Sequence, residues 1–270
     1  MAEITATLVN ELRSKTGQPM MACKKVLTEA QGDIAKAVDI FRKMGVKDSV
    51  TARITSEGRV FGALSPDGRL GAIVNINANT DFTAKSDLIR NLGQDALKVL
   101  LANPKADAAT DPTIKEKVTQ AAQTTGENVH LGKTAVATAP DGGKVGLYNY
   151  AITGKIGVLM VFSSAPTDEL VSDIGGHIAF AKPLALDRSG ISADLIAKEK
   201  EIAVEQAKAT GKPQQIAEKI AEGKLNAFFK EKTLLDQDFF NAAKFKGSVA
   251  DYLKQNKLSL LSYTRVELGQ

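Results

Sequence analysis

The sequence predicts an α+β protein with a helical module at its N-terminus, a core pattern used twice, and a protruding helical hairpin. Three observations predict this fold. Apolar residues recur at helical spacing through residues 4–45. Two hairpins of alternating apolar residues, at 59–78 and 145–162, are each followed by a helical segment. A charged, alanine-rich stretch at 192–230 contains two further helical runs.

Composition narrows the class of protein before any motif is considered. The 270 residues are 43% hydrophobic and 24% charged, the balance of an ordinary globular protein, and the net charge of +4 does not indicate nucleic-acid binding. Cys23, His130 and His177 are too few to close a structural zinc site, and one cysteine excludes an intrachain disulfide. No apolar run reaches the ~20 residues that span a bilayer. The start lacks a signal peptide, so we expect a cytoplasmic protein. The scarcity of cysteine and histidine predicts that it holds no metal.

Three short helices are expected in the N-terminal module, residues 1–46. Thr5 is a candidate N-cap of the first helix, and Pro19 suits the first turn of the second. Met20 and Met21 cannot both face so small a core. One of them is therefore a candidate contact for a partner, because methionine adapts readily to a binding surface.

Residues 59–140 are expected to form the first core subdomain, after a linker at 47–58. Strands at 59–64 and 70–78 flank a turn at 65–68, and the second strand runs into Thr80, Asp81, Phe82 and Thr83. Two interpretations of this loop are equally open from spacing. Asp81 could cap the following helix while Phe82 enters the core, or the pair could project as a charged, aromatic probe of another protein.

The same hairpin-plus-helix pattern returns in the second core subdomain, expected at 141–190 and 231–270. Strands at 145–150 and 156–162 surround a turn at 153–154, and a helix then ends before Pro183. An antiparallel coiled-coil hairpin is expected to be inserted at 191–230, with its break at 211–213. Its apolar stripe is expected at Leu195, Ile202, Ala209, Ile216 and Ile220.

Two local patterns resemble catalytic motifs and fail on geometry. In segment 126–134, five residues separate the first glycine from Gly-Lys-Thr, whereas a phosphate loop needs four. A strand is also expected to follow, where a phosphate loop is followed by a helix. Ser172, Asp173 and His177 suggest a nucleophilic triad, but neighbouring residues on a helix point about 100° apart. A histidine packed at the edge of a helix is the simpler interpretation. We expect no catalytic residue and no cofactor.

The chain resembles the bacterial translation elongation factor Ts family over essentially its whole length. Several separate motifs occur in the family's order. They are Leu12-Arg13, Thr16-Gly17, Met20-Met21, Cys23-Lys24-Lys25, Thr80-Asp81-Phe82 with Ala84-Lys85, Gly126-Glu127-Asn128, Gly211-Lys212-Pro213, Ile216-Ala217-Glu218-Lys219-Ile220 and Glu222-Gly223-Lys224-Leu225.

This resemblance implies a guanine-nucleotide exchange factor for elongation factor Tu, with a UBA-like N-terminal module. Such a factor binds the nucleotide-free GTPase more tightly than the loaded one and needs no bond chemistry of its own. The implied partner surface is the GTPase domain together with a second domain, and no nucleotide, membrane or nucleic acid is expected to bind. The resemblance assigns Thr80, Asp81, Phe82 and Thr83 to a loop that displaces Mg²⁺ from the partner. It assigns partner contacts to Arg13, Met20, Met21, Lys24, Gly126, Glu127 and Tyr150, the last standing where relatives often carry histidine.

Two other classes of function remain as alternatives. An RNA- or ribosome-binding protein would use the lysine-rich hairpin, and its affinity would fall steeply with salt. The aromatic content of 5%, without tryptophan, offers little surface for stacking bases. A nucleotide-dependent enzyme would use segment 126–134 and would bind or turn over GTP by itself.

Overall fold

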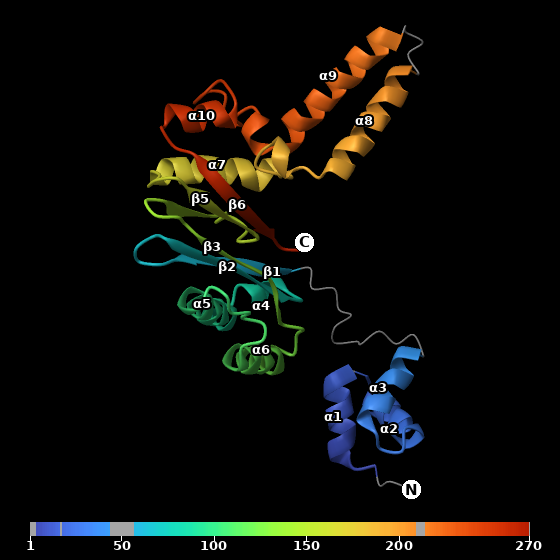
Figure 1. Ribbon diagram of the computed structural model, residues 1–270. Coiled ribbons are helices and arrows are strands. Elements are labelled where there is room, and N and C mark those ends of the chain that lie inside the picture. Colours follow the sequence, from blue (N-terminus) through green and yellow to red (C-terminus); the bar gives the residue numbers. More distant parts are fainter. Residues whose placement is uncertain (1–3, 17, 44–56, 209–213, 270) are drawn as a thin grey trace.

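The computed structural model describes residues 4–16, 18–43, 57–208 and 214–269, which form a mixed α+β fold (Figure 1). The strands are β1 (Glu57–Leu64), β2 (Leu70–Ala78), β3 (His130–Thr138), β4 (Lys144–Asn149), β5 (Ile156–Phe162) and β6 (Leu260–Glu267). The helices are α1 (Ala6–Thr16), α2 (Met20–Glu29), α3 (Ile34–Lys43), α4 (Asp81–Ala84), α5 (Asp87–Ala102), α6 (Pro112–Thr125), α7 (Asp168–Ala181), α8 (Ala193–Lys208), α9 (Gln214–Lys232) and α10 (Val249–Gln255). None of the helices in the described ranges is long and apolar enough to cross a membrane.

Helices α1, α2 and α3 confirm the three short helices expected at the N-terminus. The hydroxyl of Thr5 accepts the N–H of Leu8 at 3.3 Å, as an N-cap does. Buried side chains from all three helices form one small core: Val9, Leu12, Cys23, Val26, Leu27, Ala30, Ala37 and Phe41. Most of the expected linker at 47–58 lies outside the described residues, and strand β1 already begins at Glu57.

Two antiparallel sheets, ordered β1-β2-β3 and β4-β5-β6, pack face to face between outer layers of helices (Figure 1). In β2, Val74 and Ile76 pack beneath α5, while Ile73 packs between the sheets against residues such as Leu159 of β5. The alternation expected from the sequence is therefore correct. Both middle strands are buried on both faces because each is covered by helices and by the other sheet.

Each half of the core repeats one plan: a hairpin, a helical segment, and a third strand beside the inner strand of the hairpin. Gly71 and Gly157 lie in the two inner strands, at the contact between the sheets. An added Cβ would come within 2.7 Å of Val145 at the first glycine and 2.7 Å of Val60 at the second. The sheets approach closely at both positions because neither residue has a side chain.

The two halves run in opposite directions through the molecule. The N–H of Val145, at the start of β4, donates to the carbonyl of Gly68 in the first hairpin turn at 2.8 Å. The N–H of Val60, near the start of β1, donates to the carbonyl of Gly154 in the second hairpin turn, also at 2.8 Å. Each edge of the sandwich therefore combines the hairpin turn of one half with the inner-strand terminus of the other.

Helix α6 is an element that sequence reasoning missed. Its N-cap Asp111 accepts the N–H of Ile114 at 3.0 Å, Pro112 occupies the first position, and Gly126 closes the helix at φ +67°. Asp-Pro before the helix and glycine after it are ordinary boundary signals. They were available in the sequence, but the apolar stripe between them is weak, with only Ile114 and Ala121 buried.

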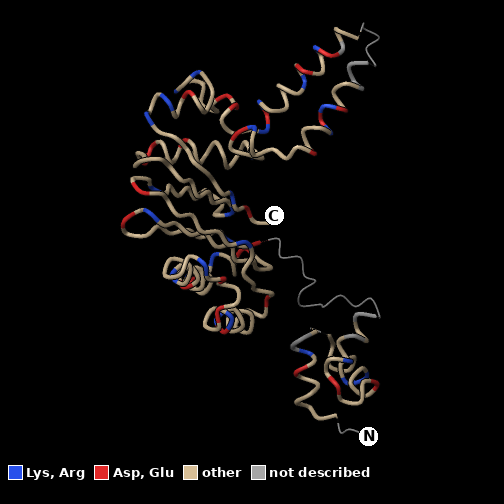
Figure 2. The backbone as a smooth tube through the Cα atoms, in the orientation of Figure 1, with Lys and Arg blue, Asp and Glu red and all other residues tan. Residues whose placement is uncertain are grey.

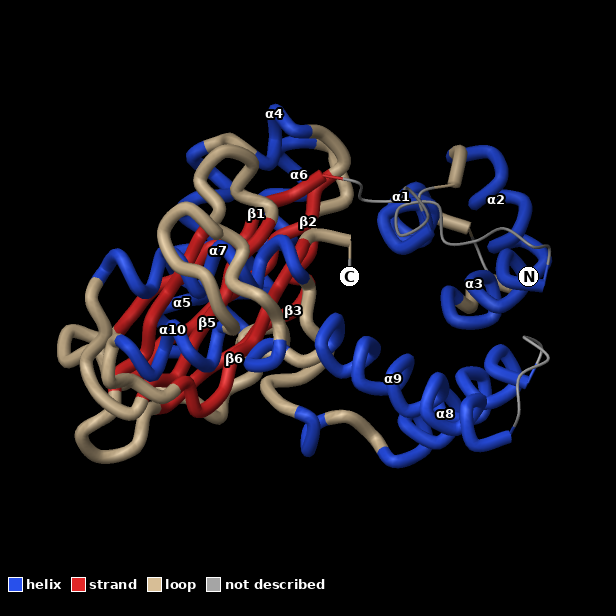
Figure 3. The backbone as a smooth tube through the Cα atoms, turned by 90° about the horizontal axis from the view of Figure 1, so that it is seen from above, coloured by secondary structure: helices blue, strands red, loops and turns tan. Residues whose placement is uncertain are grey.

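Helices α8 and α9 confirm the two helical runs and extend away from the sheets (Figures 1 and 3). The break at 211–213 lies outside the described residues, as does Ala209. The expected apolar stripe is partly wrong, because Ile202 and Ile216 are exposed. The contact is made by Ala203 and Ala221, with Val204 and Ile220 beside them, since two alanines allow close approach. Figure 2 shows both signs of charge along each helix.

Residues 231–269 complete the second sheet with β6 and supply the hydrogen-bond partners of the His177 side chain. Its Nε2 atom lies 2.8 Å from Oε1 of Gln237, and its Nδ1 accepts the N–H of Phe240 at 3.3 Å. Burial lowers the pKa of His177, which favours this neutral form. Asp173 pairs instead with Lys244 and accepts the Tyr252 hydroxyl at 2.6 Å. The interpretation of His177 as a packed structural residue is confirmed.

Candidate partner-binding site

The loop that follows β2 forms a single helical turn, α4. Its N-cap Thr80 accepts the N–H of Thr83 at 3.3 Å. The carboxylate of Asp81 pairs with Lys85 at 2.7 Å, and this hydrogen bond lowers the pKa of Asp81 below its ordinary value. Phe82 is 84% exposed. A negative charge and a bare aromatic ring therefore stand next to each other at the end of a buried strand.

This geometry excludes the interpretation in which Asp81 caps the helix and Phe82 enters the core. Thr80 is the cap instead of Asp81, and Phe82 does not enter the core. Burying a phenylalanine side chain stabilises a protein by ~1.5–3 kcal/mol. The chain leaves this stabilisation unused within its own fold, so the ring is available to a partner.

Glu127 connects the loop to the end of helix α6. Its Oε2 accepts the backbone N–H groups of Asn79 and Thr80, both at 3.0 Å. Its Oε1 accepts the hydroxyls of Thr80 at 2.6 Å and Thr83 at 2.8 Å. Burial alone would raise the pKa of Glu127, but these hydrogen bonds outweigh burial and lower it. Gly126, immediately before Glu127, has open space where a Cβ would lie.

Tyr150 lies at the same edge of the sandwich as the α4 loop. It belongs to the second hairpin turn, which is bonded to β1 near the strand's start, and β1 starts beside the end of β2. Its ring packs edge-on against Phe180 at a centroid distance of 5.0 Å. Phe180 is exposed, and Ile152 in the turn is 83% exposed. We call Phe82, Ile152 and Phe180 the apolar edge.

Sequence reasoning missed two members of the apolar edge. Phe180 lies in the last turn of α7, whose buried stripe includes Leu170, Ile174 and Ile178, and an aromatic residue two positions beyond that stripe was a usable signal. Ile152 stands in a turn between two strands, where a large β-branched residue has no core to enter. The sequence around both residues therefore indicated apolar side chains outside the core.

The remaining expected contacts lie on the N-terminal module. Arg13 and Lys24 are exposed on α1 and α2. Met20 is 50% exposed and Met21 is 76% exposed, so both methionines face outward, whereas sequence reasoning required only one to do so. The structure thus brings the α4 loop, Gly126, Glu127 and Tyr150 to one edge, and the other four residues are each exposed on the N-terminal module.

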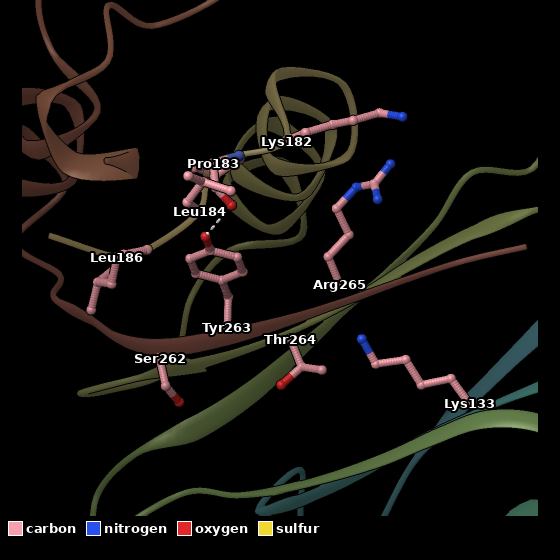
Figure 4. A pocket seen from close by; sticks show the side chains of 10 residues that line it. Lys133, Lys182, Pro183, Leu184, Leu186, Ser262, Tyr263, Thr264 and Arg265 are labelled. Atoms are coloured by element: carbon pink, nitrogen blue, oxygen red, sulfur yellow. Dashed lines mark hydrogen bonds between the residues drawn. The ribbon is translucent and has the colours of Figure 1, made fainter. Parts of the chain in front are cut away.

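A cavity of about 540 Å³ lies between β6 and the segment that follows α7 (Figure 4). Lys182 and Arg265 both pair with Glu267, at 3.0 and 2.8 Å, and the Tyr263 hydroxyl donates to the carbonyl of Pro183 at 2.8 Å. The Lys182–Glu267 and Tyr263–Pro183 contacts join the segment to the strand, whereas the Arg265–Glu267 pair lies within β6. Across the described ranges, no group of three or more His, Cys, Asp or Glu residues could hold a metal ion.

Comparison with known proteins places the chain in a family. The profile of a family described as "Elongation factor TS" matches residues 79–270. The chain is 42% identical to elongation factor Ts of Methylobacillus flagellatus, covering 100% of this chain and 94% of that protein. It is also 42% identical to elongation factor Ts of an Azoarcus species and 35% identical to that of Photorhabdus laumondii, with all of this chain covered in both cases. The matched region covers 92% of the Azoarcus protein and 94% of the Photorhabdus protein. The chain therefore belongs to the elongation factor Ts family.

Proposed function

We propose that this chain is a guanine-nucleotide exchange factor in translation elongation, which binds elongation factor Tu with GDP and promotes GDP release so that GTP can load. Membership of the family supports the activity and the partner. The observation that carries the mechanism is Phe82, a bare aromatic ring beside the charged Asp81 on an anchored turn.

The proposed mechanism acts on the metal of the partner. In GTPases, Mg²⁺ bridges the nucleotide phosphates and the protein, so disturbing its site weakens nucleotide binding. The Thr80–Thr83 turn would enter the partner with Phe82 as an apolar wedge and Asp81 as a negative charge, displacing Mg²⁺. Linkage makes the effect reciprocal, because the factor and the nucleotide lower each other's affinity by the same ratio.

Two surfaces would hold the partner. We assign Arg13, Met20, Met21 and Lys24 of a UBA-like module, residues 1–46, to the GTPase domain. The core edge that carries Gly126, Glu127 and Tyr150 would lie against the GTPase domain and a second domain. Within the core we propose subdomains at 59–140 and at 141–190 with 231–270, and α8 and α9 as the arms of a coiled-coil hairpin at 191–230.

No step of this function requires bond-making, a cofactor or nucleotide binding by the chain itself. The work is differential binding of two states of the partner. The proposed location is the cytoplasm, where translation elongation takes place. Membranes and nucleic acids have no part in it.

Release of fluorescent GDP from elongation factor Tu, under excess unlabelled GDP, tests the proposal. We expect strong acceleration by catalytic amounts of this chain. The double variant Asp81→Ala/Phe82→Ala should still bind the partner through the module and should lose most of the acceleration. An inactive wild-type chain would refute the function, and an active double variant would refute the wedge.

A further inference from the structure

Glu127 lies outside the α4 loop and accepts hydrogen bonds from the two threonines on either side of Asp81 and Phe82. Thr80 and Thr83, which flank Asp81 and Phe82, each donate a hydroxyl to its carboxylate. We propose that Glu127 is a positioning residue that holds this turn in its projecting conformation, instead of a direct contact for the partner. The inference rests on the proposed exchange function and names how its loop is kept in place.

The carboxylate has no capacity left for a partner. An ionised carboxylate accepts about four hydrogen bonds through its two oxygens. Glu127 accepts four, from the N–H groups of Asn79 and Thr80 and from the hydroxyls of Thr80 and Thr83. A partner donor could reach it only by displacing one of these bonds.

The turn needs such external support because of its length and sequence. A helix of four residues cannot stabilise itself, since fixing the first turn is unfavourable. In a capping box, the third helical residue supplies an acid that bonds back to the N-cap. Helix α10 does this with Ser248 and Asp251. In α4 the third residue is Thr83, and Glu127 supplies the carboxylate from a distant segment.

Positioning before binding gives the wedge its effect. Asp81 and Phe82 occupy the two helical positions between the anchored threonines, so fixing the threonines fixes the direction of the ring. A loop ordered in advance does not have to be ordered during association. The carboxylate of Glu127 is also charged, but both of its oxygens accept hydrogen bonds from donors within the chain. Asp81 is therefore the negative group of the turn that remains partly exposed.

Hydrogen exchange of the free chain tests the positioning role without any partner. In Glu127→Ala, we expect the amides of Asn79, Thr80 and Thr83 to exchange about tenfold faster, with β2 unchanged. Glu127→Gln should keep most of the protection, because its amide oxygen can accept the two N–H groups while its NH₂ donates to hydroxyls that reverse. Unchanged protection in Glu127→Ala would overturn the inference.

Exchange kinetics then separate positioning from contact. If Glu127 acts through the wedge, Phe82→Ala/Glu127→Ala should release GDP at the rate of Phe82→Ala alone, and Glu127→Gln should remain active. Additive losses, with Glu127→Gln as inactive as Glu127→Ala, would overturn the inference and indicate a charged contact. Asp251→Ala is the matched control, because it removes a cap carboxylate from α10 and should leave GDP release unchanged. An inactive wild-type chain would refute the proposed function alone, since the hydrogen-exchange result stands without it.

Discussion

The two edges of the sandwich share one backbone arrangement, but one edge exposes hydrophobic side chains and the other exposes polar and charged ones. Each combines a hairpin turn of one half with the inner-strand terminus of the other. One edge carries Phe82 and Ile152, the two most exposed large hydrophobic side chains of the described residues. At the other, Ser65 donates to Asp67 at 2.5 Å within the first hairpin turn, and Arg69 pairs with Asp141 at 2.7 Å. The two halves thus present similar frames, and the α4 turn with the exposed side chains makes one of them a candidate site.

The largest expected difference between the edges is in nucleotide release. Phe82→Ala should lower kcat/KM for GDP release by about 30-fold, the loss typical of a central aromatic anchor worth ~2 kcal/mol. Pro66→Ala, an exposed position in the turn at the opposite edge, should change it little. Stopped-flow release of fluorescent GDP measures both. Equal losses of GDP release in Phe82→Ala and Pro66→Ala would contradict the assignment of the site to one edge.

The glycines at the sheet contact test how alike the two halves are. Gly71→Ala and Gly157→Ala should each lower the free energy of unfolding by about 1–3 kcal/mol, because each added Cβ lies 2.7 Å from a side chain of the opposite sheet. Gly223→Ala in α9 meets nothing within 4 Å and should stabilise by up to ~1 kcal/mol. Urea unfolding gives the three values. A large gap between the first two would show that the halves are not packed equivalently.

A smaller effect is expected from the rest of the apolar edge. Ile152→Ala and Phe180→Ala should each reduce kcat/KM for GDP release by about three- to tenfold, as peripheral contacts of an interface do. Arg69→Ala at the opposite edge breaks an exposed ion pair and should leave release unchanged. A null result for both hydrophobic variants would confine the site to the α4 turn and the N-terminal module.

The smallest effect concerns pH and the order of the turn. Hydrogen bonds lower the pKa of Glu127 below its ordinary value of 4.5, so its ionised form stabilises the fold above that pH. This stabilisation is lost as the pH falls through the lowered pKa. We expect protection of the amides at 79–83, corrected for intrinsic exchange, to decrease as the pH falls below 4.5 and through the lowered pKa. Glu127→Gln should show no such decrease.

Periodicity and turn chemistry predicted most of the elements, because strand alternation and helix boundaries are local properties. Strands β1, β2, β4 and β5 and the helices of the module followed from these patterns. Helix α6 did not, since its apolar stripe is too weak to detect. The stripe of the hairpin was misplaced at Ile202 because the contact depends on how closely two alanine-bearing faces approach, which spacing does not reveal.

The candidate site was predictable in its residues more than in its geometry. The motif at 80–83 and the two methionines were candidates from the residues themselves, and Glu127 was assigned through the family resemblance. The bonding of Glu127 to the turn was not predictable, because it joins segments 44 or more residues apart. The placement of Tyr150 and Phe180 at the edge that also carries the α4 turn depends on the two halves running in opposite directions, a tertiary property that no local pattern contains.

The long reach of Glu127 also sets an order of events in synthesis and folding. Its carboxylate joins the turn across 44 to 48 residues of chain, a span that includes α5 and α6. Closing so long a loop becomes favourable only once the intervening helices have packed. Glu127 follows α5 and α6 in the chain, so we expect the turn to gain its anchor only after these two helices have formed. A nascent chain that has not yet released Glu127 from the ribosome presents residues 80–83 without this anchor, so we expect the turn to become ordered only after Glu127 has emerged.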